Sequence, residues 1–417
     1  MKKTEILRIE LDDNGHLVIP PEVAAEYRLT NGALVRLEHA DGALTISRST
    51  SNLAKVYIEI TNHCNLDCST CMRNVWDEPL GKMDIPTFMR ILEGMKGLDP
   101  KPMVFLGGYG EPLAHPDFLE MVASLRKENI QVELITNGTL LTDHVITQLI
   151  DLNVQRIWVS IDGATPANYA DVRLGDALPH VLENLSHLQR LKQMKTRSRP
   201  RLGIAFVAMQ KNLQDLPAVI RIGKNLGADL FSVSNLLPHT PEHKKEILFK
   251  RSMYSMEMQP SRWSPEVMIP RFDLNATTID IIDQIFKGHN NLNLARQAVK
   301  SATNSCPFVE KGSISIRWDG AVSPCLPLLH TYQNYLDNTL RINHAFSVGS
   351  IHEHTLNELW NDPTYVKLRE NLLAFDFSFC TYCNSCDMAE ANLEDCFGND
   401  HPSCGGCLWA QGFIQCP

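Results

Sequence analysis

The sequence predicts an α/β fold built on a parallel sheet. From about residue 55 to residue 237, apolar segments of strand length alternate with amphipathic segments of helical period. Such alternation is typical of parallel strands joined by right-handed helical crossovers. A second observation is that twelve cysteines are gathered at two places in the 417-residue chain. This clustering indicates a separate cysteine-rich unit near the C-terminus.

Residues 1–50 are expected to form a small β-rich domain. Alternating apolar segments surround Asp13-Asn14-Gly15 and Asp41-Gly42, and both turns are strong hairpin signals. The segment PEVAAEYRL between them predicts a short helix. The order of hairpin, helix and hairpin resembles the AbrB-like swapped-hairpin domain, whose members dimerise and in many cases bind DNA. Six Lys/Arg against eight Asp/Glu favour a dimerisation or docking role over DNA binding here.

Residues 51–238 are expected to hold six strands with helices between them. The expected strands are 56–61, 103–108, 131–136, 156–162, 202–209 and 230–237. Their nearly continuous apolar character fits burial on both faces of the sheet. Periodicity alone leaves an open doubly wound sheet and a barrel or partial barrel as alternatives. In either arrangement, chemistry is expected at the carboxyl ends of the strands.

The remaining chain is divided at the first C-terminal cysteine. Residues 239–305 are expected to form a bridging helical segment, with helical patterns near 241–257 and 276–300. Residues 306–417 begin with a hairpin that turns at Asp319-Gly320, continue into a helical stretch over 355–373, and end in a cysteine-dense tail.

Composition and charge exclude several classes of protein. Apolar residues at 44% and charged residues at 21% are ordinary for a soluble globular chain. No stretch approaches the ~18 apolar residues of a membrane span, and the N-terminus lacks the apolar region of a signal peptide. The net charge of −9 disfavours nucleic acid as the main partner. We therefore expect a cytoplasmic protein without a membrane partner.

Cysteine usage predicts metal or iron–sulfur sites. A cytoplasmic chain keeps its thiols reduced, so twelve cysteines are not expected to form disulfides. Three lie at Cys64, Cys68 and Cys71, none between 72 and 305, and nine from Cys306 to Cys416. A chain that merely tolerated cysteine would scatter them.

The first group, Cys64-x3-Cys68-x2-Cys71, directly follows the first expected strand of the sheet. In this spacing a short loop can wrap three thiolates around one face of a cubane and leave the fourth iron without a protein ligand. An open iron is what a substrate or cofactor needs in order to bind metal, as in catalytic zinc sites. A zinc site and three unrelated thiols remain as alternatives from spacing alone.

Further motifs stand at the ends of successive strands: Gly107-Gly108-Tyr109-Gly110-Glu111-Pro112, Thr136-Asn137-Gly138 and Ser160-Ile161-Asp162-Gly163. Singly, each is also an ordinary turn. In this order after the cysteine loop, they resemble the radical S-adenosylmethionine (SAM) superfamily, which has a partial (β/α)6 barrel. The resemblance implies SAM contacts at Gly108, Gly110, Glu111, Thr136, Asn137, Ser160, Asp162 and Arg173. Thr70 departs from the aromatic residue that the family often has before the third cysteine.

The resemblance also implies the chemistry. An external electron, expected from a ferredoxin or flavodoxin, reduces a [4Fe–4S] cluster whose open iron binds SAM. Cleavage of SAM releases methionine and a 5′-deoxyadenosyl radical, which abstracts hydrogen from the substrate. The need for a low-potential donor follows from cluster potentials that reach about −700 mV. No catalytic acid or base is singled out by the sequence.

The second cysteine group resembles the SPASM-type domain, which holds auxiliary [4Fe–4S] clusters in radical SAM enzymes. Gly320-x4-Cys325 and the later Cys-x2-Cys pairs carry this resemblance. It implies two auxiliary clusters. The nine candidate thiols are Cys306, Cys325, Cys380, Cys383, Cys386, Cys396, Cys404, Cys407 and Cys416. Two clusters would use eight of them and leave one spare. Cys-x2-Cys pairs also form zinc sites, so a pair of zinc ions is the alternative.

The segments around Cys325, Cys396 and Cys404 resemble the radical SAM maturases encoded with tungsten-containing aldehyde:ferredoxin-type oxidoreductases. The resemblance implies modification of the tungstopterin cofactor or of the oxidoreductase polypeptide. Two alternatives stay open. One is a radical SAM enzyme that crosslinks or oxidises a ribosomal precursor peptide, and the other is a zinc-stabilised AbrB-like transcription regulator. A homodimer through residues 1–50 rests on the AbrB-like resemblance alone.

Overall fold

The structure of the 417-residue chain is a computed structural model. It describes residues 13–21, 24, 35–40, 43–48, 52–165, 177–250, 266–268, 271, 273, 275–287, 293–294, 304–382 and 386–416. Within these ranges, no helix is long and apolar enough to cross a membrane.

Six parallel strands form the centre of the main sheet, as predicted. They are β3 (Lys55–Ile58), β4 (Met103–Leu106), β5 (Val132–Thr136), β6 (Arg156–Ser160), β7 (Arg201–Ala208) and β8 (Ala228–Asn235). Each pairs with the next along the chain, without the reversal of order that marks a doubly wound sheet. The α/β fold class is confirmed, and the sequential order is that of a partial barrel.

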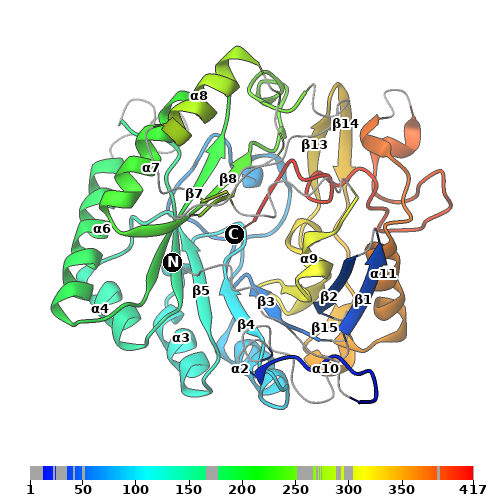
Figure 1. Ribbon diagram of the computed structural model, residues 1–417, viewed down its shortest axis with the longest axis horizontal. Helices are drawn as coiled ribbons and strands as arrows, with labels where there is room; N and C mark the ends of the chain where they lie inside the picture. Colours follow the sequence, from blue (N-terminus) through cyan, green and yellow to red (C-terminus); the bar gives the residue numbers. More distant parts are fainter. Residues whose placement is uncertain are drawn as a thin grey trace.

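Helices cover the outer face of this sheet (Figure 1). They are α2 (Ile85–Lys96), α3 (Phe118–Lys127), α4 (Asp143–Asp151), α6 (Ala177–Met194) and α7 (Leu216–Asn225). Two of them begin at side-chain caps, where Asp84 accepts from the Thr87 amide and Thr142 from the Val145 amide. Their apolar faces pack on the strands in one continuous core.

Alternation along β3 decides what faces the barrel interior. Val56, Ile58 and Ile60 pack in the core beneath the helices. Tyr57 belongs instead to a second core with Trp409 and other residues of the C-terminal part. Because side chains alternate along a strand, Glu59 shares the inner side with Tyr57.

The main sheet extends beyond the six central strands at both edges. At one edge are β9 (Glu266–Met268) and β10 (Asn293–Leu294), and at the other are β11 (Ser313–Ile316), β12 (Ala321–Ser323) and β15 (Gly349–Ser350). β11 lies parallel to β3, with Ser313 opposite Lys55. The C-terminal part is therefore joined to the barrel by one continuous sheet.

The expected helix near 241–257 is wrong over its described part, residues 241–250. That part holds only a short 3-10 turn at His243–Lys245. Ile247, Leu248 and Phe249 are all buried, and three consecutive buried side chains cannot share one face of a helix. The second expected helix is present over Ala276–Lys287 as α8, and residues 293–294 of its expected range belong to a strand instead.

The C-terminal part contains the predicted hairpin as β11 and β12, joined through the turn at Asp319-Gly320. A second hairpin pairs β13 (Tyr332–Leu336) with β14 (Thr339–Asn343). Its helices are α9 (Pro307–Glu310), α10 (Leu356–Trp360) and α11 (Pro363–Ala374). In the N-terminal part, β1 (Val35–Ala40) and β2 (Ala43–Arg48) form the hairpin expected around Asp41-Gly42. The turn residues themselves and the first expected strand lie outside the described residues.

Candidate functional site

The cysteine loop leaves the carboxyl end of β3 and folds back on itself. Three N–H groups approach its sulfur atoms: the Leu66 amide at 3.4 Å from Cys64 Sγ, Arg73 Nε at 3.3 Å from Cys71 Sγ, and Asn137 Nδ2 at 3.8 Å from Cys64 Sγ. Donors aimed at sulfur stabilise thiolates, the form in which cysteine binds metal. The loop therefore fits an iron–sulfur cluster.

Arg73 holds the same loop closed, and sequence reasoning missed it. Its Nη2 donates to the Leu66 carbonyl at 2.9 Å, and its Nη1 reaches the Asn62 carbonyl at 3.4 Å. Burial raises the pKa of Cys64, which the Leu66 amide and the Arg73 charge oppose. A guanidinium beside the sulfurs was not detectable from the cysteine spacing, although an arginine two residues after the third cysteine was a visible signal.

The glycine-rich segment after β4 lies against the cysteine loop. A Cβ on Gly110 would come within 2.3 Å of the Thr61 carbonyl oxygen and 2.5 Å of the His63 carbonyl oxygen. The amide of Glu111 donates to the same His63 carbonyl at 2.8 Å. Only glycine allows this approach of two backbones, so the predicted motif has a direct structural reason.

The predicted residues after β4 and β5 meet at one point. Thr136 Oγ1 donates to Glu111 Oε1, and the Asn137 amide donates to Glu111 Oε2, both at 2.7 Å. Asn137 Nδ2 also donates to Asn65 Oδ1 at 2.9 Å. Glu111 is buried, so its carboxylate is fixed beside the cysteine loop by two strand ends.

The predicted residues after β6 lie one strand further along the sheet. Asp162 is buried, its Oδ1 accepts from the Val207 amide at 2.7 Å, and its carbonyl accepts from Asn212 Nδ2 at 3.0 Å. Asp162 thus ties the end of β6 to β7. Ser160 is half-buried as the last residue of β6. Arg173 lies outside the described residues.

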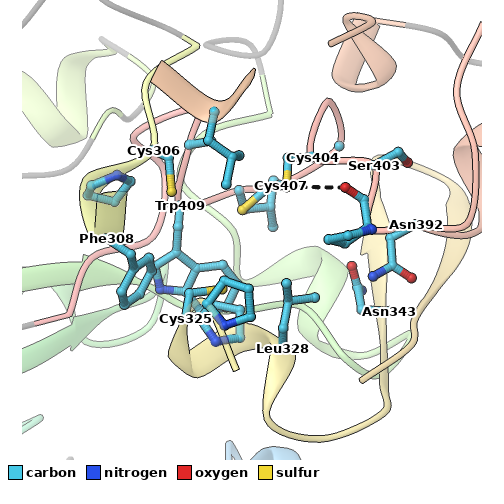
Figure 2. Close-up of a pocket in the computed structure, with 18 of the residues that line it drawn as sticks. Cys306, Phe308, Cys325, Leu328, Asn343, Asn392, Ser403, Cys404, Cys407 and Trp409 are labelled. Atoms are coloured by element: carbon cyan, nitrogen blue, oxygen red, sulfur yellow. Dashed lines mark hydrogen bonds between the residues drawn. The ribbon is translucent and has the colours of Figure 1, made fainter. Parts of the chain in front are cut away.

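Four of the nine C-terminal thiols line one pocket. Cys306 precedes α9, Cys325 follows β12, and Cys404 and Cys407 flank a tight turn (Figure 2). Burial raises the pKa of all four thiols, that of Cys306 to about 12. Four thiols around one cavity, Cys325 buried and the other three half-buried, fit a four-thiolate cluster, which removes their protons on binding.

The other described C-terminal thiols do not line this pocket. Cys380 is buried with its Sγ 3.1 Å from Ser378 Oγ, Cys386 is half-buried and Cys396 is exposed. Cys416 accepts from Trp409 Nε1 at 3.3 Å and packs in the core that includes Tyr57 of β3. Cys383 lies outside the described residues.

Arg341 lies next to the four-thiol pocket. It is buried, its Nη1 donates to the Ala389 carbonyl at 2.7 Å, and its guanidinium packs against Gly406 between Cys404 and Cys407. The positive charges of Arg341 and Arg73 were both missed from the sequence, because nothing in the cysteine spacing indicates which arginine folds back onto sulfur.

Comparison with known proteins identifies two families of domain. A family described as the radical SAM superfamily matches residues 58–197, and one described as an iron-sulfur cluster-binding domain, SPASM, matches residues 306–387. The second match favours iron–sulfur clusters over zinc in this part. Among the residues that the structure describes, no three His, Cys, Asp or Glu side chains are grouped to hold a single metal ion.

A curated relative covers most of the chain. The tungsten-containing aldehyde ferredoxin oxidoreductase cofactor-modifying protein of Pyrococcus furiosus is 32% identical over 87% of this chain and 96% of its own length. SuiB of Streptococcus suis bound to its precursor peptide SuiA has a similar fold, with a TM-score of 0.55, 16% identity, and coverage of 76% of this chain and 67% of that one. SuiB bound to SAM gives a TM-score of 0.54 at 14% identity, with 80% and 71% covered.

Proposed function

Because the chain belongs to the radical SAM superfamily and carries a SPASM domain, we propose that it modifies the tungstopterin cofactor or the polypeptide of a tungsten-dependent oxidoreductase during maturation. It is an enzyme, and its cofactors are [4Fe–4S] clusters and SAM. The observation that supports the substrate is the 32% identity that extends over 96% of a protein named for this cofactor modification.

In this proposal Cys64, Cys68 and Cys71 would hold a cluster with an open iron for SAM. Such a cluster with SAM would supply the radical chemistry of hydrogen abstraction. Arg73 and Asn137 hold the loop through their contacts to sulfur. Glu111, fixed by the ends of two strands, supplies a buried negative charge suited to the SAM amino group. Gly108, Gly110, Thr136, Ser160, Asp162 and Arg173 complete the proposed SAM contacts.

We propose the auxiliary clusters from the positions of the thiols. Cys306, Cys325, Cys404 and Cys407 line one pocket and would hold one cluster. Five thiols remain. We propose Cys416 as the spare, because its sulfur already accepts from the Trp409 indole. The second cluster would then use Cys380, Cys383, Cys386 and Cys396. The proposed domains are a head of residues 1–50, the barrel of 51–238, a bridge of 239–305 and a C-terminal domain of 306–417. Both auxiliary clusters would lie in the C-terminal domain.

Anaerobic reconstitution tests the chemistry. We expect about twelve iron and twelve sulfide per chain, from three [4Fe–4S] clusters, and reductive cleavage of SAM. Replacing Cys64, Cys68 and Cys71 together with Ala should abolish cleavage and leave about eight iron. Cleavage that persists in this variant would show that the SAM-binding cluster is assigned to the wrong cysteines. Stoichiometric zinc without cleavage would support the AbrB-like regulator instead.

The substrate and the electron donor need their own test. We expect the full chain to capture a tungsten oxidoreductase under anaerobic conditions, and mass spectrometry to show a SAM-dependent change in its cofactor or polypeptide when a ferredoxin or flavodoxin supplies electrons. Recovery of a short precursor peptide alone would favour the peptide-modifying alternative.

A further inference from the structure

A chain of ionisable side chains crosses from the barrel to the SPASM domain. Glu59, just after β3, is fully buried, and its Oε1 lies 2.7 Å from Nε2 of His330, whose side chain is 1% exposed. The other ring nitrogen of His330 lies 3.4 Å from Glu78 Oε2. Glu78 in turn accepts from the Thr331 amide at 2.9 Å and lies 3.7 Å from Arg317 Nη1. Carboxylates buried this deeply are stable only when they are paired.

Glu59 supports the glycine-rich segment from beneath. Its Oε2 accepts from the Tyr109 amide at 2.9 Å. A Cβ on Gly108 would come within 2.6 Å of the Glu59 carboxylate, so the backbone at Gly108 lies directly on this side chain. The position of Glu59 therefore fixes the position of the segment that continues into Gly110 and Glu111.

His330 comes from the chain segment that begins at Cys325 of the four-thiol pocket. The same segment makes a second contact with the glycine-rich segment, because Tyr109 Oη donates to the Leu326 carbonyl at 3.2 Å. Trp76, from the cysteine loop's own continuation, packs on both aromatic partners, with ring centroids 4.4 Å from His330 and 5.4 Å from Tyr109. Tyr109 is thus held from two sides, by Leu326 and by Trp76.

The charges around His330 favour its role as a donor. Burial opposes a positive charge on the ring, but the hydrogen bonds and charges of Glu59 and Glu78 outweigh it and raise the pKa of His330. With both ring nitrogens protonated, His330 can donate to Glu59 and Glu78 at once. The charge on Glu59 is then balanced without a contact to bulk water.

We propose that His330, supplied by the SPASM domain, is a positioning residue for SAM binding: acting through Glu59, it fixes the Gly108-Tyr109 backbone against the cysteine loop. This inference rests on the proposed function, because it assigns the glycine-rich segment to SAM. It gives the SPASM domain a part in forming the SAM site besides holding auxiliary clusters.

The test compares His330→Leu with His330→Gln. Leucine removes the donor to Glu59, and we expect the KM for SAM to rise by about tenfold or more, since buried bonds to charged groups are of that strength. Glutamine places an amide N–H near the original Nε2, so it should restore most of the SAM affinity. The kcat at saturating SAM and the iron content should change much less than KM. His354→Leu, at an exposed histidine of the same domain, is the matched control.

A spectroscopic measurement accompanies the kinetics. Adding SAM to the reduced wild-type enzyme should change the electron paramagnetic resonance signal of the SAM-binding cluster, and His330→Leu should need correspondingly more SAM for the same change. If His330→Leu fails to fold, His330→Asn takes its place, because the shorter amide cannot occupy the Nε2 position that contacts Glu59 and should also raise the KM for SAM. A wild-type KM in the folded His330→Leu or His330→Asn enzyme would overturn the inference. A wild-type enzyme that leaves SAM intact would instead overturn the proposed function.

Discussion

Lys55, the first residue of β3, is a lysine buried inside the barrel. Its Nζ lies 4.3 Å from the ring centroid of Tyr57 and 4.4 Å from that of Phe105. Burial, followed by the charge of Lys311, lowers the pKa of Lys55 to about 7, although Glu133 and Cys416 act in the other direction. At neutral pH the folded protein therefore holds this amine only partly charged, whereas the unfolded chain holds it fully charged.

The titration of Lys55 makes stability depend on pH in a known direction. Because the folded-state pKa is about 7 and the ordinary value is 10.5, the unfolded chain binds more protons between these values. Stability relative to a Lys55→Met variant should therefore rise with pH in this range, by at most about 1.4 kcal/mol per pH unit. We expect the melting temperature of Lys55→Met to exceed that of the wild type at about pH 6.5. This difference should become smaller as the pH rises to about 9.5.

Thermal unfolding of the anaerobic, reconstituted protein measures this difference. Lys96→Met is the matched control, because Lys96 lies on the surface of α2 in an ion pair with Glu93. Its substitution should give a difference that does not change over the same range. A Lys55→Met difference that stays constant with pH would mean that Lys55 is charged in the folded protein throughout.

At the scale of elements, two loops at neighbouring strand ends interlock. Gly110→Ala would drive a Cβ into the Thr61 and His63 carbonyl oxygens, and both belong to backbone that has little freedom to move. We expect SAM cleavage to fall roughly tenfold or more, the effect of a steric conflict of about 1–3 kcal/mol placed directly in the site. Gly97→Ala at the end of α2, where a Cβ meets nothing within 4 Å, should leave the rate unchanged. An active Gly110→Ala enzyme would show that the two loops can separate.

The elements of the barrel were predictable because their signals are local. All six expected strands are present, with ends that differ by a few residues, as in the expected 230–237 against β8 at Ala228–Asn235. The parallel pairing of β11 with β3 was not predictable. A four-residue segment such as Ser313–Ile316, in which serine and isoleucine alternate, carries no local mark of which strand it joins.

The site divides in the same way. The three-cysteine loop and the glycine-rich motif could be proposed from the sequence because their residues are close in sequence and the proposed chemistry requires that spacing. Arg73 and Asn137 reach sulfur through the fold, and His330 meets Glu59 only because the C-terminal part closes on the barrel. One signal for the last pair was present: Glu59 is a charged residue within the otherwise apolar segment VYIEI.

At the scale of the whole molecule, we expect the barrel to depend on the C-terminal part for its folding but not on the head. The core that contains Tyr57 and Phe105 of the barrel also contains Leu328, Trp409 and Phe413. A chain that ends at residue 305 should therefore fail to fold as a soluble barrel. Residues 52–417 alone should keep the SAM cleavage rate of the full chain, measured as anaerobic formation of 5′-deoxyadenosine.

The comparison of residues 52–417 with the full chain tests the role of residues 1–50. If the head is a dimerisation module, light scattering should give a dimer for the full chain and a monomer for residues 52–417. The same oligomeric state for both chains would exclude the dimerisation role. Loss of SAM cleavage on removing the head would show that the head takes part in the reaction.

The pairing of β3 with β11 also bears on the order in which the protein is made. β3 leads into the cysteine loop near the start of the barrel, yet its partner Ser313–Ile316 leaves the ribosome only after the whole barrel has been synthesised. Until then the edge of β3 is open to pairing with other chains, which is a hazard for aggregation. Contacts this distant in sequence also form slowly. The edge of β3 beside the cysteine loop is therefore covered only when the cysteine-rich C-terminal part emerges, so the nascent chain should depend on chaperones that cover this edge.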